Sequence, residues 1–181
     1  KLIKANLQVL IFNQRSIEEI LEVILTIGRI VSAEDKAQKL VDGYKKRLNL
    51  LREKSEKIQN KPRVYFEEWD DPTFSGIRWV SELIEIAGGE DIFANKSHGK
   101  LAMEREIQWS DVIEKNPDVI LASWCGKPVD IDSIKKREGW NEITAIKNDR
   151  IHEIDSSIIL QPGPACLTDG LKVLEQLITS K

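Results

Sequence analysis

Residues 63–93 read RVYFEEWDDPTFSGIRWVSELIEIAGGEDIF, and the order of residue types predicts a strand, a loop and a helix. Val64 to Phe66 is a short apolar run, which is typical of a buried strand. Residues 67–74 are mainly polar and are expected to form a loop. The helix would then run to Gly88 and Gly89, because glycine adopts the left-handed conformation of a helix stop at no side-chain cost.

The loop at 67–74 is the first indication of function. It carries two large aromatic side chains, Trp69 and Phe74, among polar and acidic residues. The helix that follows has one apolar face, made of Ile77, Val80, Leu83, Ile84 and Ala87. In open α/β sheets the ligand binds at the carboxyl ends of the strands. Two aromatics in such a loop therefore predict contact with a ligand.

The same order of elements recurs further along the chain. Residues 119–122 (VILA) predict a second buried strand, followed by a loop at 123–128. Residues 150–154 alternate as a third strand, with an outgoing loop at 155–161, and a last helix opens at Gly163. Strands that alternate with helices predict an α/β fold, a mainly parallel sheet sandwiched by helices.

Upstream of this unit the sequence predicts part of another lobe. Residues 9–12 (VLIF) read as a short buried strand, and Ser16 and Glu19 have the spacing of a capping box at a helix start. That helix, to about Gly28, is apolar nearly all round, so we expect it to be covered on more than one side. Residues 1–31 cannot supply such cover, and we interpret them as the end of a first lobe whose beginning is absent.

A long helix is predicted between residues 33 and 58. Apolar residues recur there at steps of three and four, Ser32 can act as the N-cap, and Gly43 is the one internal break. The span corresponds to roughly 39 Å of helix. Such a helix could brace two lobes or pack on the surface of one domain, and the periodicity alone leaves both readings open.

Composition excludes several classes of function. The chain has 181 residues, a net charge of −3 and a pI of about 5.6, so nothing points to nucleic acid. No apolar run approaches the roughly 18–20 residues of a membrane span. Two cysteines, Cys125 and Cys166, form neither a disulfide framework nor a metal or redox motif. The sequence starts at Lys1 rather than at methionine, so its first residues do not identify the compartment.

Three of the predicted strands end in unusual loops. If the strands are parallel, the loops meet at one edge of the sheet and form a shallow aromatic and aliphatic surface. Such a surface suits a large, flat and largely uncharged ligand better than a phosphate or an amino acid. The predicted ligand-binding residues are Trp69, Asp70, Phe74, Trp124, Cys125, Ser157, Ile158 and Leu160. The remaining tryptophans, Trp79, Trp109 and Trp140, are interpreted as structural.

The sequence favours neither a metal site nor an enzyme. The acids at 67–71 lack the spacing of a calcium loop, so we interpret them as a solvated acidic loop. His98 and His152 lie far apart, whereas a metal carrier gathers several histidines and carboxylates. Cys125 has no histidine near it in sequence, and no phosphate loop or nucleophile elbow is present. We therefore expect no cofactor and no catalytic residue.

The order of several motifs resembles a known family. They are EEWDDPTFSGIRWVSELIEIAGGEDIF, IQWSDVIEKNPDVILASWCG and REGWNEITAIKNDRIHEIDSSIILQPGPACLTDGLKVLEQLI. Together they resemble the cobalamin-binding family of ABC-transporter substrate-binding proteins, in order from about Asn6 to Ile178. Each motif is weak alone, and the combination is specific. Wider relatives with the same architecture carry ferric siderophores or haem.

The resemblance implies two α/β lobes joined by one long helix, with the ligand between them. Residues 1–31 would then be the remnant of the first lobe, 32–60 the connecting helix and 61–181 the second lobe. The implied ligand is cobalamin or a related corrinoid, captured outside the cytoplasmic membrane, in the periplasm or at the cell surface, with any anchor upstream of this chain. The implied protein partner is the permease of an ABC importer.

The family docks to its permease through an acidic residue on each lobe. By position, the resemblance implies Asp111 as the docking residue of the second lobe, with Glu104 and Glu106 nearby. Relatives tend to have two acids where this chain has Ser110 and Asp111. Relatives also often place an arginine after the proline at 164, where this chain has Ala165, so that arginine's interaction is not implied here.

Two other functions are left open by the residues. The first is a ferric-siderophore or haem binder, although cleft arginines are scarce apart from Arg15 and Arg78. The second is a truncated α/β module that acts only through protein–protein association. The apolar helix near the N-terminus favours this second reading, because exposed apolar surface promotes association. It predicts a homodimer, or a swap of the N-terminal segment between two copies.

Overall fold

A five-stranded, mainly parallel sheet forms the centre of the computed structural model, which describes residue 4 and residues 8–180. The strand order is β2-β1-β4-β5, and β3 also pairs with β1. The pairs of β1 with β3, β1 with β4 and β4 with β5 are parallel, and β2 runs antiparallel to β1. This confirms the predicted α/β fold. The strands are β1 (Arg63–Asp70), β2 (Thr73–Ser75), β3 (Glu90–Asp91), β4 (Val119–Ala122) and β5 (Ile151–Glu153).

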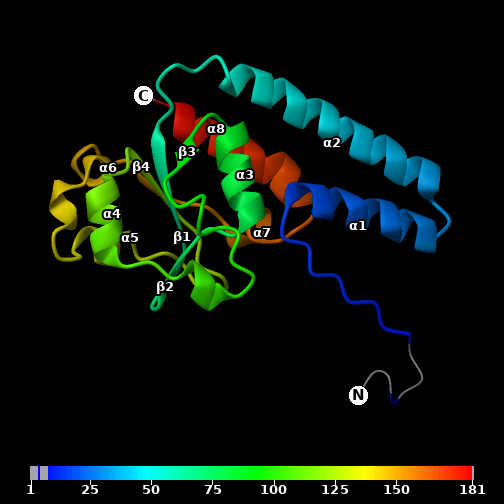
Figure 1. The fold of residues 1–181 in the computed structure, drawn as a ribbon, viewed down its shortest axis with the longest axis horizontal. Coiled ribbons are helices and arrows are strands. Elements are labelled where there is room, and N and C mark those ends of the chain that lie inside the picture. Colours follow the sequence, from blue (N-terminus) through cyan, green and yellow to red (C-terminus); the bar gives the residue numbers. More distant parts are fainter. Residues whose placement is uncertain (1–3, 5–7, 181) are drawn as a thin grey trace.

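Helices cover both faces of the sheet (Figure 1). The α-helices are α1 (Ile17–Ile30), α2 (Glu34–Ser55), α3 (Arg78–Ile86), α4 (Trp109–Lys115), α5 (Ile131–Lys135), α6 (Thr144–Lys147), α7 (Ser156–Ile159) and α8 (Leu171–Thr179). Short 3-10 helices η2 (Ala102–Arg105) and η3 (Trp140–Glu142) and a π-helix η4 (Cys166–Gly170) complete the described elements. None of these helices is both long enough and apolar enough to span a bilayer.

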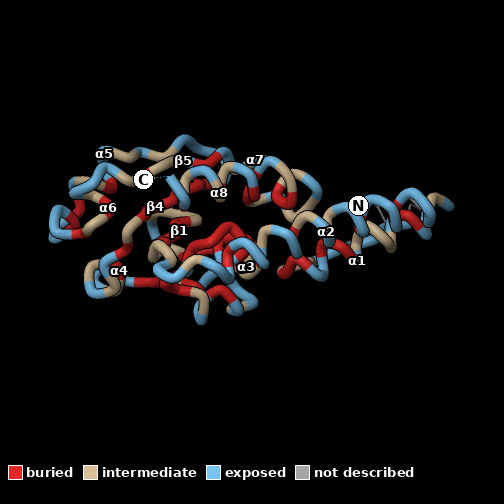
Figure 2. Tube along the Cα trace, turned by 90° about the horizontal axis from the view of Figure 1, so that it is seen from above, coloured by how far each residue is buried: buried red, intermediate tan, exposed pale blue. Residues whose placement is uncertain are grey.

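Each face of the sheet has its own hydrophobic core, because successive side chains of a strand point to opposite faces. Val64 and Phe66 of β1 pack with buried residues of α1, α2, α3 and α8. Tyr65, between them, packs with buried residues of α4 and α5 on the other face. The same alternation holds in β4, where Leu121 belongs to the first core and Ile120 to the second. Buried residues concentrate along β1 and β4, because both faces of these strands are covered (Figure 2).

The two N-terminal helices, α1 and α2, lie side by side and extend beyond the sheet (Figure 1). The predicted capping box is present, because the Ser16 side chain accepts from the Glu19 amide and the Glu19 carboxylate accepts from the Ser16 amide. Gly28 lets the helices approach, since an added Cβ would lie 2.4 Å from Cβ of Ala37. Glu82 of α3 accepts from the Ile17 amide and so ties α1 to the main body.

The predicted strand at residues 9–12 is wrong. These residues form neither helix nor strand, and Leu10 and Ile11 are 64% and 87% exposed. An apolar run becomes a buried strand only where a neighbouring strand offers hydrogen bonds and a core offers cover. In the described part of the chain, residues 8–13 have neither, and they lead away from α1 (Figure 1).

The predicted loop at 67–74 is also wrong in its extent. Strand β1 continues to Asp70 and turns back into β2, which places Trp69 opposite Phe74. Hydrophobicity alone did not predict this strand, because the stretch is rich in acids. Three of these acids are paired with basic residues that are distant in sequence, which allows them to lie in a strand. The long helix is confirmed, and its bounds are Glu34–Ser55 rather than 33–58.

Candidate functional site

The three strand-end loops meet at one edge, as the parallel sheet requires. Glu67 of β1 lies opposite Ala122 of β4, and Ala122 lies opposite Glu153 of β5. The chain therefore leaves β1, β4 and β5 at the same edge. A hollow of about 570 Å³ opens there, and its lining residues come from the β4 and β5 loops. They are Trp124, Gly126, Lys127, Pro128, Glu153, Ile154, Asp155 and Ser156.

Lys127, in the loop after β4, contacts the last two residues of β1. Its Nζ lies 4.5 Å from the ring centre of Trp69 and 4.7 Å from that of Trp124. The same Nζ donates to both carboxylate oxygens of Asp70, each at 2.8 Å. Partial burial would raise the pKa of Asp70, and the hydrogen bonds and charge of Lys127 outweigh it and lower that pKa. Sequence reasoning missed Lys127, although its place in a strand-end loop after Gly126 was an available signal.

Trp69 and Phe74 are neighbours across the β1–β2 hairpin. Both are half-buried, and the Trp69 indole N–H donates to the carbonyl of Asp71 at 3.1 Å. This hydrogen bond and the strand pairing hold the Trp69 ring at the sheet edge. Cys125 is exposed in the β4 loop beside Trp124. The structure thus places four of the predicted ligand residues, Trp69, Asp70, Phe74 and Trp124, in or next to one cluster.

Trp124 is more deeply set than the sequence suggested. Only 4% of its surface is exposed, and its indole N–H donates to Glu67 Oε1 at 3.1 Å. It still lines the 570 Å³ hollow, and Lys127 lies over its ring. Trp124 therefore offers only a margin of its surface to this hollow, and Trp69 does not line it.

The third loop is a short helix rather than an irregular segment. Asp155 caps α7 by accepting from the Ser157 amide at 2.8 Å, and Ser157 itself is exposed. Ile158 and Leu160 are half-buried and pack against the first core. Of the predicted residues in this loop, none lines the hollow, which is bordered instead by the preceding positions up to Ser156.

The acids at 67–71 do not form a solvated loop, which corrects the prediction. Glu67 is fully buried and pairs with Arg137. Glu68 pairs with Arg105, whose Nη1 and Nη2 lie 2.6 and 2.9 Å from its carboxylate oxygens. Asp70 pairs with Lys127, as described above. The remaining acid of the run is exposed, as predicted, at position 71.

Tyr65 belongs to the same buried network as Glu67. Its hydroxyl donates to Glu67 Oε2 at 2.9 Å. Burial, followed by the neighbouring Glu67 carboxylate, raises the pKa of Tyr65 well above its ordinary value. The hydroxyl therefore stays protonated and remains a donor. The Trp124 indole N–H donates to the same carboxylate, so this network holds the Trp124 ring in place.

The predicted docking acids lie near the start of α4. Asp111 accepts from the Gln108 amide at 3.2 Å, and Glu104 accepts from the Lys100 amide at 2.7 Å. The backbone of Glu106 forms an isolated antiparallel β-bridge with that of Phe74 in the β1–β2 hairpin. A shallow hollow of about 330 Å³ separates the hairpin tip from α4, and it is lined by Asp70, Asp71, Pro72, Thr73, Glu106, Ile107, Gln108, Trp109 and Ser110.

Trp79, Trp109 and Trp140 occupy three different structural positions. Trp79 and Trp140 are buried, and the Trp79 indole N–H donates to the carbonyl of Ile159 at 2.9 Å. Trp109 is 43% exposed and donates to the Thr73 hydroxyl at 3.0 Å. The Arg137 guanidinium lies 4.8 Å from the Trp109 ring centre and 4.6 Å from that of Trp140. Trp79 and Trp140 are thus core residues, whereas Trp109 lines the hollow beside the hairpin, and the structural interpretation of the three stays a prediction.

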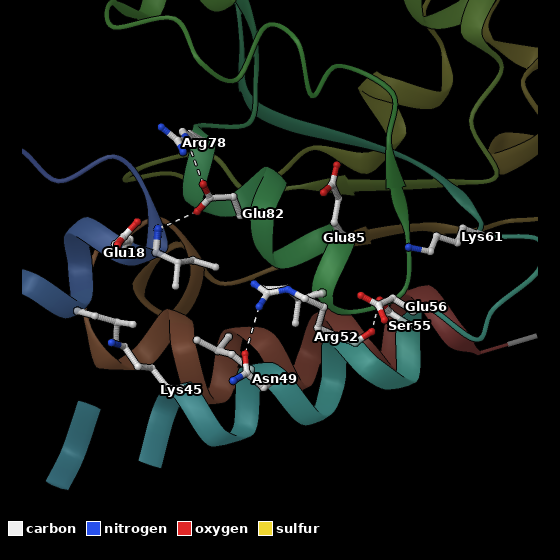
Figure 3. Close-up of a pocket in the computed structure, with 14 residues that line it drawn as sticks. Glu18, Lys45, Asn49, Arg52, Ser55, Glu56, Lys61, Arg78, Glu82 and Glu85 are labelled. Carbon is white, nitrogen blue, oxygen red and sulfur yellow. Dashed lines mark hydrogen bonds and ion pairs between the residues drawn. The ribbon is translucent and has the colours of Figure 1, made fainter. Parts of the chain in front are cut away.

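A second large hollow, of about 580 Å³, lies between α1, α2 and α3 (Figure 3). Its lining contains four acids and four bases, and Arg78 and Glu82 pair across 2.8 Å. None of the predicted ligand residues lines it. The mixed charges suit a flat apolar ligand poorly, so the strand-end edge remains the better candidate. Its charged residues are Glu18, Lys45, Arg52, Glu56, Lys61, Arg78, Glu82 and Glu85.

No group of three or more His, Cys, Asp or Glu side chains in the described residues is arranged to hold a metal ion. The two cysteines are free and differ in their surroundings. Cys125 is exposed, whereas Cys166 is buried and donates to the carbonyl of Gly163. Burial raises the pKa of the Cys166 thiol to about 11, so it is not poised as a nucleophile.

Comparison with known proteins gives a consistent family. A family profile described as Periplasmic binding protein matches residues 1–158. The chain is 28% identical over 180 residues to the uncharacterized ABC transporter substrate-binding lipoprotein YvrC of Bacillus subtilis (strain 168), covering 96% of this chain and 54% of the relative. It is 25% identical over 168 residues to the vitamin B12-binding protein of Vibrio parahaemolyticus, covering 92% of this chain and 58% of the relative.

Solved structures show the same fold. An ABC transporter substrate-binding protein of Listeria monocytogenes superposes with a TM-score of 0.82 at 19% identity, covering 99% of this chain and 71% of that one. S. aureus IsdE, solved in complex with haem, superposes with a TM-score of 0.79 at 17% identity, again covering 99% of this chain and 71% of that one. The chain spans about half the length of the curated relatives it matches.

Proposed function

The chain belongs to the periplasmic binding protein family, and on that premise we propose that it is the ligand-binding component of an ABC importer. Its ligand would be cobalamin or a related corrinoid, bound outside the cytoplasmic membrane and handed to a permease without chemical change. The resemblance to the vitamin B12-binding protein of Vibrio parahaemolyticus supports this ligand. The resemblance to a Bacillus subtilis lipoprotein supports an extracytoplasmic location.

We also propose a division of the chain into lobes. Residues 1–31 would be the end of a first lobe, 32–60 the connecting helix and 61–181 the second lobe. The α1–α2 pair that projects beyond the sheet supports this division (Figure 1). So does the coverage of about half of each curated relative. On this proposal, the strand-end edge of the second lobe is one wall of the ligand cleft.

The observation that carries the ligand proposal is the aromatic edge. Trp69 lies in β1 and Trp124 follows the neighbouring parallel strand β4. Trp124 and Lys127 line a hollow of about 570 Å³, and Lys127 lies over the rings of both tryptophans. Aromatic faces pack well on large flat ligands, and nearby carboxylates and backbone groups can accept hydrogen bonds from peripheral amides. The corrin ring is flat and carries amide side chains. The predicted contacts at Cys125, Ser157, Ile158 and Leu160 remain part of this proposal.

Docking to a permease would use the acids near the start of α4. Asp111 sits in the first turn of that helix, and Glu104 and Glu106 lie on the preceding segment. Carboxylates at a surface pair with arginine through charge-assisted hydrogen bonds. We therefore propose Asp111 as the main docking residue of this lobe, with Glu104 and Glu106 as neighbours.

Calorimetric titration of cobalamin tests the proposal. The titration is made into this chain and, in parallel, into a longer version that carries a first lobe upstream. Saturable binding is expected, and Trp69→Ala should weaken it by about tenfold or more, because a central aromatic anchor is lost. Trp109→Ala is the matched control, since Trp109 is a solvent-accessible tryptophan that borders the α4 hollow instead. Equal effects of the two variants would show that Trp69 is not part of the site. If neither this chain nor the longer version binds cobalamin while folded, the corrinoid proposal is overturned.

A haem or ferric-siderophore ligand is the alternative within the same family. The fold is similar to that of haem-bound IsdE, which supports this alternative. Against it, the charged residues at the edge are the acids Asp70, Glu153 and Asp155 and the single base Lys127. An anionic chelate would face more negative than positive charge there. Competition between cobalamin, haemin and a ferric hydroxamate for this chain separates the alternatives.

A second candidate function is self-association. Apolar side chains are exposed on the segment before α1 and at the far end of the α1–α2 pair, namely Val9, Leu10, Ile11, Phe12, Ile27, Ile30, Val31 and Leu40. Clustered apolar surface favours contact with another chain. We propose that this chain alone forms a homodimer or exchanges its N-terminal segment. Sedimentation at increasing concentration tests this, and a strictly monomeric chain would contradict it.

A further inference from the structure

Lys127 occupies the surface on which a flat ligand would pack. Its ammonium lies 4.5 Å from the ring centre of Trp69 and 4.7 Å from that of Trp124, so it is in contact range of both rings at once. Asp70 holds the ammonium through two hydrogen bonds of 2.8 Å. In this arrangement the lysine ammonium lies over one face of the Trp69 ring.

The contacts that hold the Lys127 ammonium over the rings are weak. Its side chain is 40% exposed and the side chain of Asp70 is 27% exposed, so water screens their attraction. A cation–ring contact whose cation is accessible to water, as the Lys127 ammonium is, contributes roughly a two- to fivefold factor to an equilibrium constant. Contacts of this size hold a side chain in place and still yield to a ligand that buries the same rings.

The loop that carries Lys127 can let it move. Gly126, immediately before it, has a φ of +84°, and an added Cβ there would meet no atom within 4 Å. The 570 Å³ hollow begins directly beside the side chain, because Lys127 is one of its lining residues. The ammonium can therefore leave the rings by rotation of its own side chain, with β4 unchanged.

New partners for the ammonium lie around the same hollow. Glu153 and Asp155 both line it, and each already accepts one backbone N–H, from Val129 and Ser157 respectively. A carboxylate accepts more than one hydrogen bond, so either could take the ammonium. A ligand with a peripheral carboxylate could take it instead.

We propose that Lys127 is a displaceable cover of the aromatic edge and thereby sets the charge preference of the ligand. The inference rests on the proposed function of this edge. A ligand without carboxylates must displace the ammonium and lose its contacts with the rings. A ligand with carboxylates also displaces it, but its own carboxylate can then pair with the ammonium and so add to the binding. Lys127 therefore opposes binding of the first kind and favours binding of the second.

Two probes of different charge test the preference. Cyanocobalamin has no free carboxylate, whereas haemin has two. In the full 181-residue chain, Lys127→Met should tighten cyanocobalamin by about threefold to tenfold, since two cation–ring contacts no longer oppose it. The same variant should leave haemin unchanged or weaken it. Lys172→Met, at an exposed position of α8, is the matched control and should change neither. Equal shifts for both probes, or no shift for cyanocobalamin, would overturn the proposal.

Proton NMR of lysine methylene groups gives a readout that needs no affinity. Ring currents of Trp69 and Trp124 should move the Lys127 ε-methylene signal upfield in the free chain, and the signal missing in Lys127→Met assigns it. Saturation with cyanocobalamin should return it to the ordinary lysine position. Two results would overturn the displacement while binding is still observed. One is a Lys127 ε-methylene signal at the ordinary lysine position in the free chain, and the other is a signal that stays upfield at saturation. An upfield signal with no binding of either probe would overturn the proposed function, and the displacement with it.

Discussion

Arg137 and Glu67 form a buried ion pair across 70 residues of sequence. Arg137 Nη1 lies 2.5 Å from Glu67 Oε2, and Nη2 lies 3.0 Å from Oε1. The Tyr65 hydroxyl and the Trp124 indole N–H donate to the same carboxylate. The Glu67 carboxylate, inside β1, therefore connects Trp124, in the loop after β4, to Arg137, after α5.

Removal of the Glu67 charge should destabilise the fold strongly. Glu67→Gln leaves the Arg137 guanidinium buried without its counter-ion, and breaking a buried pair in this way costs about 3–5 kcal/mol. Urea unfolding measures the loss. Glu142→Gln is the control, because Glu142 pairs with Lys147 at the surface, and its unfolding midpoint should not change. A loss for Glu67→Gln as small as that of the control would contradict a role of this pair in stability.

Asp91 should make stability depend on pH. It is buried, its Oδ1 accepts from the Phe93 amide at 2.9 Å, and its Oδ2 has no hydrogen-bond partner in the described residues. Burial raises the pKa of Asp91 in the folded chain above its value in the unfolded chain. The folded chain then binds the proton more tightly, so this group's contribution is fully present below the unfolded pKa and is lost as pH rises through the folded pKa.

The test is the variant Asp91→Asn, which keeps the shape and cannot ionise. It should be more stable than the natural chain at pH 7, and the difference should shrink as pH falls toward about 4. Urea unfolding at a series of pH values measures both. A difference that does not vary with pH, or that grows at low pH, would contradict the assigned cause.

Gly170 and Gly43 should respond in opposite ways to alanine. A Cβ at Gly170, where the π-helix meets α8, would lie 2.3 Å from the carbonyl oxygen of Ile158. Gly170→Ala should therefore destabilise the chain by roughly 1–3 kcal/mol, as overpacking does. A Cβ at Gly43, inside α2, would meet nothing within 4 Å. Gly43→Ala should stabilise by about 0.5–1 kcal/mol through helix propensity. Thermal unfolding distinguishes the two, and a shared sign would be against this reading.

The two thiols should react at very different rates. Cys125 is exposed, whereas Cys166 is fully buried with a pKa raised to about 11 by that burial. Because the thiolate is the reactive form, a thiol reagent at pH 8 should label Cys125 alone in the folded chain. Addition of denaturant should expose the second. Cys125→Ser should abolish the native-state reaction, and persistent labelling of that variant would show that Cys166 is accessible.

Much of the fold was predictable because its signals are local. The apolar runs at 64–66 and 119–122 became β1 and β4, and the three- and four-residue spacing after Ser32 became α2. The register of parallel strands then brought Trp69 and Trp124 to one edge, as predicted. Lys127 was not predicted: its place in a strand-end loop was a signal for the site, but no local pattern shows that its ammonium lies over two tryptophan rings.

Where local signals misled, a distant partner decided the outcome. Residues 9–12 have the composition of a strand and remain exposed, since no strand in the described part of the chain lies beside them. Glu67 and Glu68 look like loop residues and lie in a strand, because Arg137 and Arg105 neutralise them. Neither arginine is near its acid in sequence.

By itself the sequence determined most of the helices, the cores of β1 and β4, the α/β class and the family, because hydrophobic periodicity, caps and glycine stops act within a few residues. The tertiary structure alone decided which charges are buried and which tryptophan faces remain available. Those properties depend on contacts such as Arg137 with Glu67 and Lys127 with Trp69, which join residues that only the folded sheet brings together.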